Sequence, residues 1–278
     1  MAGSSGQLGR ALLSRLGPRV VWAGNSGALD VRDAAAVRAR VQDARPDVVI
    51  NATAYNKVDR AEVERDEAMA VNEAGPRHLA AAAAEMGALL VHVSTNYVFD
   101  GALRRPYTEE DEARPLGVYG LSKLAGEAAV ARVGGRHLIV RTSALFGRTE
   151  SRETPGNFVD RILAGARAGL PLRVVDDQEV STTYAPDLAA GIVALVEADC
   201  TGLFHVVNEG SCTWHALAVE ALTQAGLGAR VEALRSEELA APARRPGYSV
   251  LSTARYRSRG LPPLRDWRAA LADHLANV

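Results

Sequence analysis

The sequence predicts an α/β protein with a doubly wound parallel sheet and a smaller C-terminal α/β lobe. Short apolar runs alternate with alanine-rich helical stretches, the pattern of strands joined by crossover helices. The runs at 48–50 and 89–91 are apolar at every position, which indicates strands covered on both faces. A glycine-rich segment at 3–9 stands directly ahead of a helical pattern.

The expected elements follow from these patterns in chain order. Strands are expected at 19–23, 47–52, 88–93, 137–141, 172–175, 202–207 and 249–251. Helices are expected at 7–16, 61–87 and 118–133, and a further helix begins near Ala34. Either Asp33 or Asp30 is suited to cap that helix, because a carboxylate accepts the free N–H groups of the first turn.

Composition narrows the class of partner. The 278 residues hold 32 Lys and Arg against 33 Asp and Glu, a balance that argues against nucleic acid or an anionic membrane as a partner. The two cysteines and six scattered histidines predict neither a disulfide framework nor a metal site. Without a long apolar run or a signal pattern, the expected location is the cytoplasm.

Gly3, Gly6 and Gly9 precede the first helix at a spacing of three. Such a loop lets backbone N–H groups approach a pyrophosphate, although a flexible N-terminus has the same composition. In the Rossmann fold this loop follows a buried strand, whereas only Met1 and Ala2 precede it here. We therefore expect a Rossmann-like sheet whose first strand is missing or shortened, with unpaired backbone groups on the flanking strands.

The choice between NADPH and NADH stays open. An acidic residue usually ends the second strand and accepts the ribose 2′-hydroxyl, but Asn25 stands in that place. Asp30 and Val31 are candidates for contact with the adenine, and the helix-cap interpretation of Asp30 has equal weight.

Prolines and short elements become frequent after about residue 150. We predict a dinucleotide-binding domain over 1–148 and a substrate-binding lobe over 149–278, with about 184–208 returning to the first domain. The lobe is expected to cover the carboxyl edge of the sheet, where α/β proteins bind their ligands.

Tyr119 and Lys123 stand four residues apart in a helical stretch, so both project from one face. An ammonium beside a phenol favours phenolate, and we expect it to lower the pKa of Tyr119. Thr95 ends a buried strand, where its hydroxyl is suited to hold a carbonyl oxygen near Tyr119. Taken alone, Tyr-x-x-x-Lys is also typical of a solvated surface pair.

Motifs along nearly the whole chain carry a family resemblance. They lie at 3–9, 49–55, 71–72, 94–101, 119–123, 126–127, 141–143, 156–158, 175–178, 187–189 and 245–246. With them the chain resembles the extended short-chain dehydrogenases/reductases. The resemblance implies reduction of the C4 ketone of a nucleotide-linked 4-keto-6-deoxy sugar by NADPH or NADH, with conversion of dTDP-4-dehydrorhamnose to dTDP-rhamnose as the first expectation.

The resemblance also implies roles for particular residues. Tyr119 would donate the proton, Lys123 would bind the nicotinamide ribose, and Thr95 would bond the ketone oxygen. The cofactor-binding set would be Gly3, Gly6, Gln7, Leu8, Asp30, Val31, Ala52, Ala54, Tyr55, Tyr119 and Lys123. The substrate-binding set would be Thr95, Asn96, Tyr97, Asn157 and Arg245. A solvated loop is an equal alternative for Arg245, and a homodimer is an open alternative to a monomer.

Departures from the family pattern gather in the substrate-facing motifs. Asn96, Ala144 and Tyr248 stand where the family usually has Asp, Trp and Asn, so the ketoreductase chemistry is better supported than the particular sugar. An epimerase, another nucleotide-sugar ketoreductase, or a non-catalytic NADP-binding subunit like the β-subunit of methionine adenosyltransferase are the alternatives. A 4,6-dehydratase is excluded because Asn96 and Tyr97 follow Thr95 in place of acids.

Overall fold

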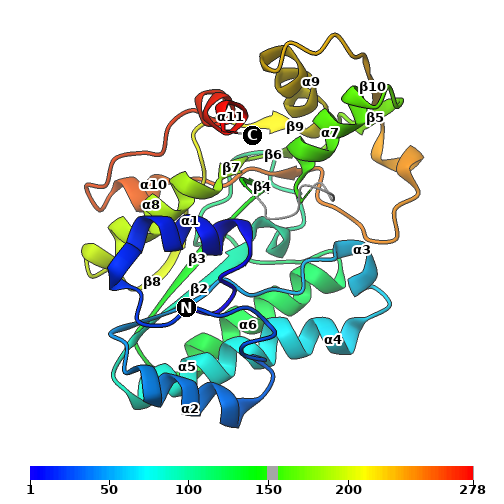
Figure 1. Cartoon of the computed structure of the whole chain (residues 1–278). Coiled ribbons are helices and arrows are strands. Elements are labelled where there is room, and N and C mark those ends of the chain that lie inside the picture. Colours follow the sequence, from blue (N-terminus) through cyan, green and yellow to red (C-terminus); the bar gives the residue numbers. More distant parts are fainter. Residues whose placement is uncertain (149–155, 278) are drawn as a thin grey trace.

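A parallel sheet in the order β1-β2-β3-β8 forms the central layer (Figure 1). The computed structural model describes residues 1–148 and 156–277. The strands are β1 (Val48–Asn51), β2 (Leu89–Thr95), β3 (His137–Thr142) and β8 (Gly202–His205). The register sets Ile50 beside Val91 and Val91 beside Leu138, so apolar residues form rows across the sheet. The α/β class with a Rossmann-like parallel sheet is confirmed.

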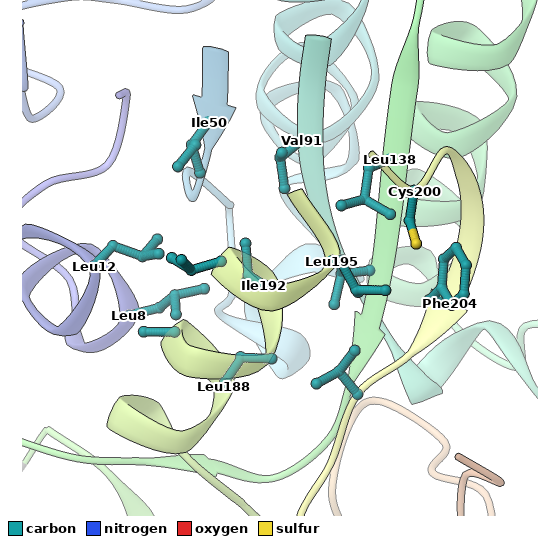
Figure 2. Close-up of a cluster of buried hydrophobic side chains, with 14 of the residues drawn as sticks. Leu8, Leu12, Ile50, Val91, Leu138, Leu188, Ile192, Leu195, Cys200 and Phe204 are labelled. Carbon is teal, nitrogen blue, oxygen red and sulfur yellow. The ribbon is translucent and has the colours of Figure 1, made fainter. Parts of the chain in front are cut away.

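Helices cover both faces of this sheet. One face carries α1 (Gln7–Leu16) and α8 (Ala185–Glu197), and the other carries α2 (Ala34–Ala44), α5 (Gly75–Glu85) and α6 (Val118–Val133). Figure 2 shows Leu12 of α1 and Ile192 of α8 directed toward the strands. Val37 and Leu79 pack on the opposite face. Burial on both sides explains why the strands are apolar at every position.

The C-terminal half builds a second core above the carboxyl edge of the sheet. Its strands pair as β5 (Leu172–Val175) with β10 (Val231–Leu234), β6 (Glu179–Val180) with β9 (Cys212–Thr213) and β11 (Tyr248–Ser249), and β4 (Leu145–Phe146) with β7 (Thr183–Tyr184). Its helices are α7 (Phe158–Arg167), α9 (Trp214–Gln224) and α11 (Trp267–Ala276), whereas α10 (Ala254–Arg257) packs on the first sheet beside β8 through Tyr256. Val159, Leu217 and Trp267 are buried together in this core.

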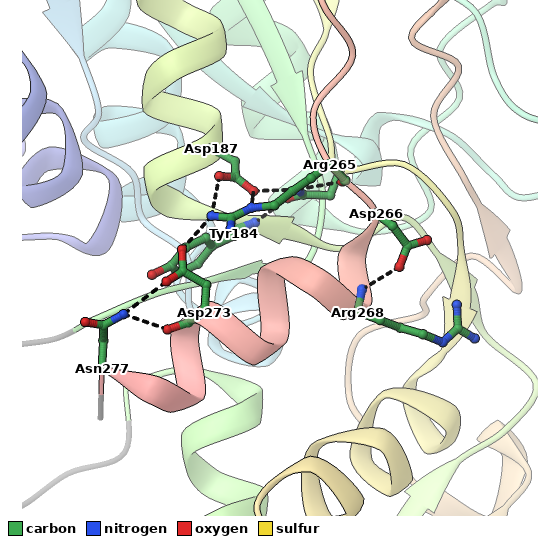
Figure 3. Close-up of polar contacts among 8 residues, drawn as sticks. Tyr184, Asp187, Arg265, Asp266, Arg268, Asp273 and Asn277 are labelled. Carbon is green, nitrogen blue, oxygen red and sulfur yellow. Dashed lines mark hydrogen bonds and ion pairs between the residues drawn. The ribbon is translucent and has the colours of Figure 1, made fainter.

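Arg265 fastens the last helix to α8. Figure 3 shows its guanidinium between Asp187 at the start of α8 and Asp273 of α11, at 2.8 and 2.6 Å. Asn208 donates a 2.7 Å hydrogen bond to the same Asp187. Helix α8 packs on the first sheet, and β8 is one of its strands. The domain boundaries, including the return of 184–208 to the first domain, stay a prediction.

The structure places several elements where the sequence predicts them. The bounds of α1, α6 and β5 are those expected, and β1, β2, β3 and β8 differ at their ends by one or two residues. The strand expected at 249–251 has other bounds in the structure. Strand β11 covers Tyr248–Ser249, and beyond it Leu251 forms an isolated bridge with Tyr107. No helix among the described residues is long and apolar enough to cross a membrane.

The helix expected at 61–87 is found over 65–85 with a π-helical turn inside it, and a break at 62–64 separates it from a short helix before it. The chain forms α3 (Val58–Ala61), α4 (Arg65–Met69), a π-helical turn at Ala70–Ala74 and then α5. Pro76 follows this turn and, because it has no N–H, interrupts the α-helical hydrogen-bond pattern at that point. The π-helical turn carries Asn72, whose amide bonds the backbone of Tyr55 and the hydroxyl of Ser122. These tertiary hydrogen bonds accompany the local departure from α-helical bonding.

The strand expected at 19–23 is wrong. Only Gly24 forms a bridge there, with Ala2, and Ala2 bridges Asn51 of β1 on its other side. Val21 is 69% exposed. An apolar segment becomes a strand only when a neighbour satisfies its backbone, and along 19–23 that neighbour is present only at the end near Ala2.

Candidate active site

Two elements bring the predicted catalytic side chains to the carboxyl edge of the sheet. Thr95 is the last residue of β2, and α6 carries Tyr119 and Lys123 in its first two turns. Gly117 caps α6 without a side chain, and the Glu62 carboxylate instead accepts the N–H of Val118 at 2.9 Å. The helix therefore begins at a fixed position relative to β2.

The three side chains converge. Thr95 lies close enough to Tyr119 for its hydroxyl to lower the pKa of the phenol. Tyr97 packs edge-on against Tyr119 with ring centroids 5.6 Å apart. Lys123 is 2% exposed and its ammonium donates to the Val93 carbonyl at 2.6 Å. A phenol, an alcohol and a buried ammonium thus share one edge, the donor set needed to bind and protonate a carbonyl oxygen.

Gly120 allows this close approach. A Cβ at this position would collide with the backbone carbonyl of Tyr97, and it would stand 3.0 Å from the side chain of Pro115. Absence of a side chain lets α6 lie directly against the turn after β2, which sets the distance between Tyr119 and Thr95.

The expected lowering of the Tyr119 pKa is wrong for the ligand-free protein. Burial raises the pKa of Tyr119 to about 12, an effect that the Thr95 hydrogen bond only partly offsets. Lys123 does not lower this pKa because its ammonium is directed to the Val93 carbonyl. Tyr119 consequently keeps its proton at neutral pH and is available as a donor.

Burial lowers the pKa of Lys123 to about 8, although the Glu127 carboxylate acts in the opposite sense. An unfolded lysine titrates near 10.4, so between about pH 8 and 10.4 the unfolded chain binds the extra proton. The free energy of unfolding should therefore rise by about 3 kcal/mol as pH increases through this window. Below pH 8 the folded chain carries the full destabilisation that comes from burying the charged Lys123 ammonium.

Denaturant unfolding from pH 7 to 11 measures this contribution. Lys123→Met should flatten the rise relative to the unaltered chain. Lys57→Met serves as the control, because Lys57 is exposed. Equal pH dependence in the chain with and without Lys123 would contradict the burial argument.

Behind Lys123 lies a buried ion pair. Glu127 accepts two hydrogen bonds from Arg141, at 2.9 and 2.6 Å, and a third from Ser94 at 2.5 Å. Both charged side chains are at most 7% exposed. The Arg141 guanidinium also lies 5.1 Å from the ring centre of Phe99. This pair ties α6 to β2 and β3 directly beneath the candidate catalytic residues.

A second polar network links α6 to the predicted cofactor groove. Asn72 accepts the backbone N–H of Tyr55 at 2.9 Å and donates to the Ser122 hydroxyl at 3.0 Å, which donates in turn to the Tyr119 carbonyl. The Tyr55 hydroxyl donates to Glu64. Ala52, Ala54 and Tyr55 follow β1 at the same edge of the sheet, and their contact with a cofactor stays a prediction.

The glycine loop lies where β1 and α1 meet. Gly3 has a φ of +86°, and a Cβ there would stand 2.6 Å from the carbonyl carbon of Ala52. Gly6 precedes α1 without any side-chain cap, so the N–H groups of the first turn, near Gln7 and Leu8, stay available to an anion. The loop fits a pyrophosphate.

Gly3→Ala should lower the affinity for NADPH by at least about tenfold, since the methyl group must displace the Ala52 backbone and force a left-handed φ. Fluorescence titration of NADPH measures this affinity. Gly17→Ala is the control: it also has a positive φ, but nothing lies near its added Cβ. Equal losses in the two variants would show that general strain, not the loop, is responsible.

At the adenine end, the structure distinguishes the two aspartates. Asp33 caps α2 by accepting the N–H groups of Ala35 and Ala36. Asp30 accepts the N–H of Arg32 and pairs with its guanidinium at 2.6 Å. Asp30 is therefore not the helix cap. Contact of Asp30 and of the buried Val31 with adenine stays a prediction.

The predicted substrate residues do not all gather in one place. Asn96 is buried after β2 and donates to Ser249 of β11 at 2.8 Å, which brings the second core against the catalytic edge. Arg245 lies near Tyr97 and pairs with Asp59 at 2.8 Å. Asn157 instead caps α7 and donates to the Gly147 carbonyl. Its binding role is untested.

Sequence reasoning missed Asp59, Glu62 and the pairing of Glu127 with Arg141. Asp59 and Glu62 lie in a charged helical stretch, and the sequence does not distinguish them from solvent-exposed charged residues there. Glu127 follows Lys123 by four residues, so its position on the same helix face was a usable signal. Its partner on β3 was not visible from spacing alone.

Comparison with known proteins identifies the family. A family model described as "RmlD substrate binding domain" matches residues 1–278. The chain belongs to this family. It is 44% identical to a dTDP-4-dehydrorhamnose reductase of Streptomyces griseus, over 98% of this chain and 91% of that protein.

Solved structures agree with this assignment. A dTDP-4-dehydrorhamnose reductase of Bacillus anthracis in complex with NADP has a TM-score of 0.95 at 35% identity, over 100% of this chain and 98% of the other. The corresponding protein of Clostridium acetobutylicum has a TM-score of 0.94 at 34% identity, over 99% and 97%. The fold and the family are thereby settled together.

Proposed function

We propose that the protein reduces the C4 ketone of a nucleotide-linked 4-keto-6-deoxy sugar, with dTDP-4-dehydrorhamnose as substrate and dTDP-rhamnose as product. The observation that carries this proposal is the convergence of Thr95, Tyr119 and the buried Lys123 at the carboxyl edge of the sheet. The names of the relatives at 34–44% identity support it. They favour an enzyme over a non-catalytic regulatory subunit.

NADPH or NADH is the proposed cofactor, and the residues present fit it. Gly3, Gly6, Gln7 and Leu8 would hold the pyrophosphate at the uncapped start of α1. Asp30 and Val31 would contact the adenine, while Ala52, Ala54 and Tyr55 would line the groove. Lys123 would bind the nicotinamide ribose. When bound, the cofactor supplies the hydride to C4 of the sugar.

The chain's own residues supply orientation and the proton. Thr95 donates to the ketone oxygen and fixes it beside Tyr119. As the oxygen gains negative charge, Tyr119 gives it the phenolic proton, and the product is an alcohol. A phenol whose pKa is about 12 is fully protonated at neutral pH, so the proton is in place before the reaction. Lys123 beneath the ribose would aid reprotonation of Tyr119.

Asn96, Tyr97 and Arg245 are the proposed substrate contacts near this edge, with Asn157 further away. The Arg245 guanidinium donates to the Asp59 carboxylate and to the Ala243 carbonyl, and a diphosphate would replace these partners. Arg245→Met should raise KM by about tenfold or more with a smaller change in kcat. Arg257→Met is the control, because Arg257 is exposed and lies on α10, away from the catalytic edge. A change in kcat alone would contradict this role.

The direct test is oxidation of NADPH or NADH by a panel of dTDP- and UDP-linked 4-keto sugars. We expect turnover with dTDP-4-dehydrorhamnose and product that carries a C4 hydroxyl. Tight cofactor binding without turnover on any of these sugars would refute the proposal. We also propose a cytoplasmic location, which cell fractionation tests, and a homodimer, which analytical ultracentrifugation tests.

A further inference from the structure

The first turn of α6 receives its cap from a residue far away in the sequence. Gly117 precedes the helix and has no side chain to accept a free N–H. The Glu62 carboxylate, half-buried directly after α3, accepts the N–H of Val118 at 2.9 Å instead. A negative charge at this end of a helix also interacts favourably with the helix dipole. Glu62 therefore does for α6 what a local Asp or Ser does for most helices.

The glycine at 117 makes room for this carboxylate. A Cβ there would stand 2.7 Å from Glu62 Oε1, whereas the Arg244 carbonyl oxygen would be 3.8 Å away. The backbone of Gly117 is extended, with φ −142° and ψ 172°, a conformation that residues with side chains also adopt. Among the described residues, the close obstacle to a methyl group at 117 is thus the Glu62 carboxylate.

Contacts on two sides hold Glu62 in place. Ala61, the residue before it, is fully buried and clusters with Val118 of α6. Asp59, on the same turn, accepts a hydrogen bond from Arg245 at 2.8 Å. The Glu62 carboxylate is therefore presented to α6 from a turn that is itself packed and hydrogen-bonded.

We propose that Glu62 is a positioning residue for Tyr119, because it fixes where α6 begins; the inference rests on the proposed ketone reduction. Tyr119 is the second residue of α6, so a shift of the helix start moves its phenol relative to Thr95. A misplacement of about 1 Å can lower a rate by about a hundredfold. Arg245 and the glycine loop are not part of α6, so loss of Glu62 should lower kcat with little change in KM.

The first comparison is kinetic. Glu62→Ala should lower kcat for the 4-keto sugar by about tenfold or more, while KM for the sugar and for NADPH stays nearly unchanged. Glu62→Gln keeps an acceptor oxygen and should retain most of kcat. Asp266→Ala is the matched control, because the Asp266 carboxylate caps α11 in the second core by accepting the Arg268 N–H at 2.8 Å. This control should lower stability but not kcat.

Substitutions at 117 test whether Glu62 acts through its contact with the helix start. Gly117→Ala should lower kcat as Glu62→Ala does, because the methyl group must displace the carboxylate. In the Glu62→Ala background it should cause no further loss. Gly117→Ser in that background supplies a local cap, and part of kcat should return. Unchanged kcat in Glu62→Ala, a loss confined to KM, or additive losses in the double variant would overturn the proposal.

Hydrogen exchange monitors the helix start without catalysis. Exchange at the Val118 amide should become faster by about tenfold or more in Glu62→Ala, and it should not change in Asp266→Ala. Unchanged exchange in Glu62→Ala would overturn the proposal whether or not the chain turns over. Faster exchange in a chain that reduces none of the sugars would refute the proposed function and would leave Glu62 as the residue that fixes the start of α6.

Discussion

Tyr119→Phe is expected to lower kcat/KM for the 4-keto sugar by about 10²–10⁴-fold. The variant loses the phenolic proton that is proposed to pass to the ketone oxygen, while its ring still packs against Tyr97. NADPH affinity should change little, because the glycine loop is untouched. Steady-state kinetics and fluorescence titration of NADPH measure the two effects separately.

Tyr256→Phe is a suitable control for this variant. Tyr256 is also buried, but it packs on the sheet face with α1 and α8, away from the catalytic edge. Its kinetics should stay close to those of the unaltered protein. If Tyr119→Phe retained full turnover, Tyr119 would not be the proton donor.

Arg141→Met is expected to lower the free energy of unfolding by about 3–5 kcal/mol. The substitution leaves the Glu127 carboxylate buried without its bidentate partner, since only Ser94 still donates to it. Desolvation of that charge is no longer balanced. Urea unfolding at pH 7 measures the loss, and thermal unfolding should fall in parallel.

The double variant Glu127→Met with Arg141→Met separates charge from packing. Removing both partners leaves apolar groups of similar volume, so most of the lost stability should return. Arg38→Met is a surface control, because Arg38 pairs with Glu85 while more than half exposed, and it should cost no more than about 1 kcal/mol. A double variant less stable than Arg141→Met would contradict the role of the unpaired carboxylate.

The sequence predicts the elements that depend on neighbouring residues better than those that depend on partners far away in the chain. Helices α1 and α6 and strand β5 have the predicted bounds, because their periodicity, glycine caps and apolar runs are local. The π-helical turn within 65–85 carries Asn72, whose hydrogen bonds reach Tyr55 and Ser122. Segment 19–23 has strand composition but lacks a neighbour along most of its length. Both differences concern partners distant in sequence.

In the candidate site, too, local patterns were predictive and tertiary contacts were not. Thr95, Tyr119 and Lys123 were predicted from spacing and from the end of a strand, and the structure brings them together. The direction of the Tyr119 pKa was wrong, because it depends on burial and on where the Lys123 ammonium points. Asp59 carries no local signal; its partner, Arg245, is far away in the sequence.

The most direct test of the proposed chemistry uses NADPH deuterated at the transferring position of the nicotinamide. We predict dTDP-rhamnose with one deuterium at C4, formed with one NADPH oxidised per sugar, and formation of the same labelled product about 10²–10⁴-fold more slowly by Tyr119→Phe. Unlabelled product, or isomerised sugar formed without net oxidation of NADPH, would contradict ketone reduction and indicate an epimerase instead.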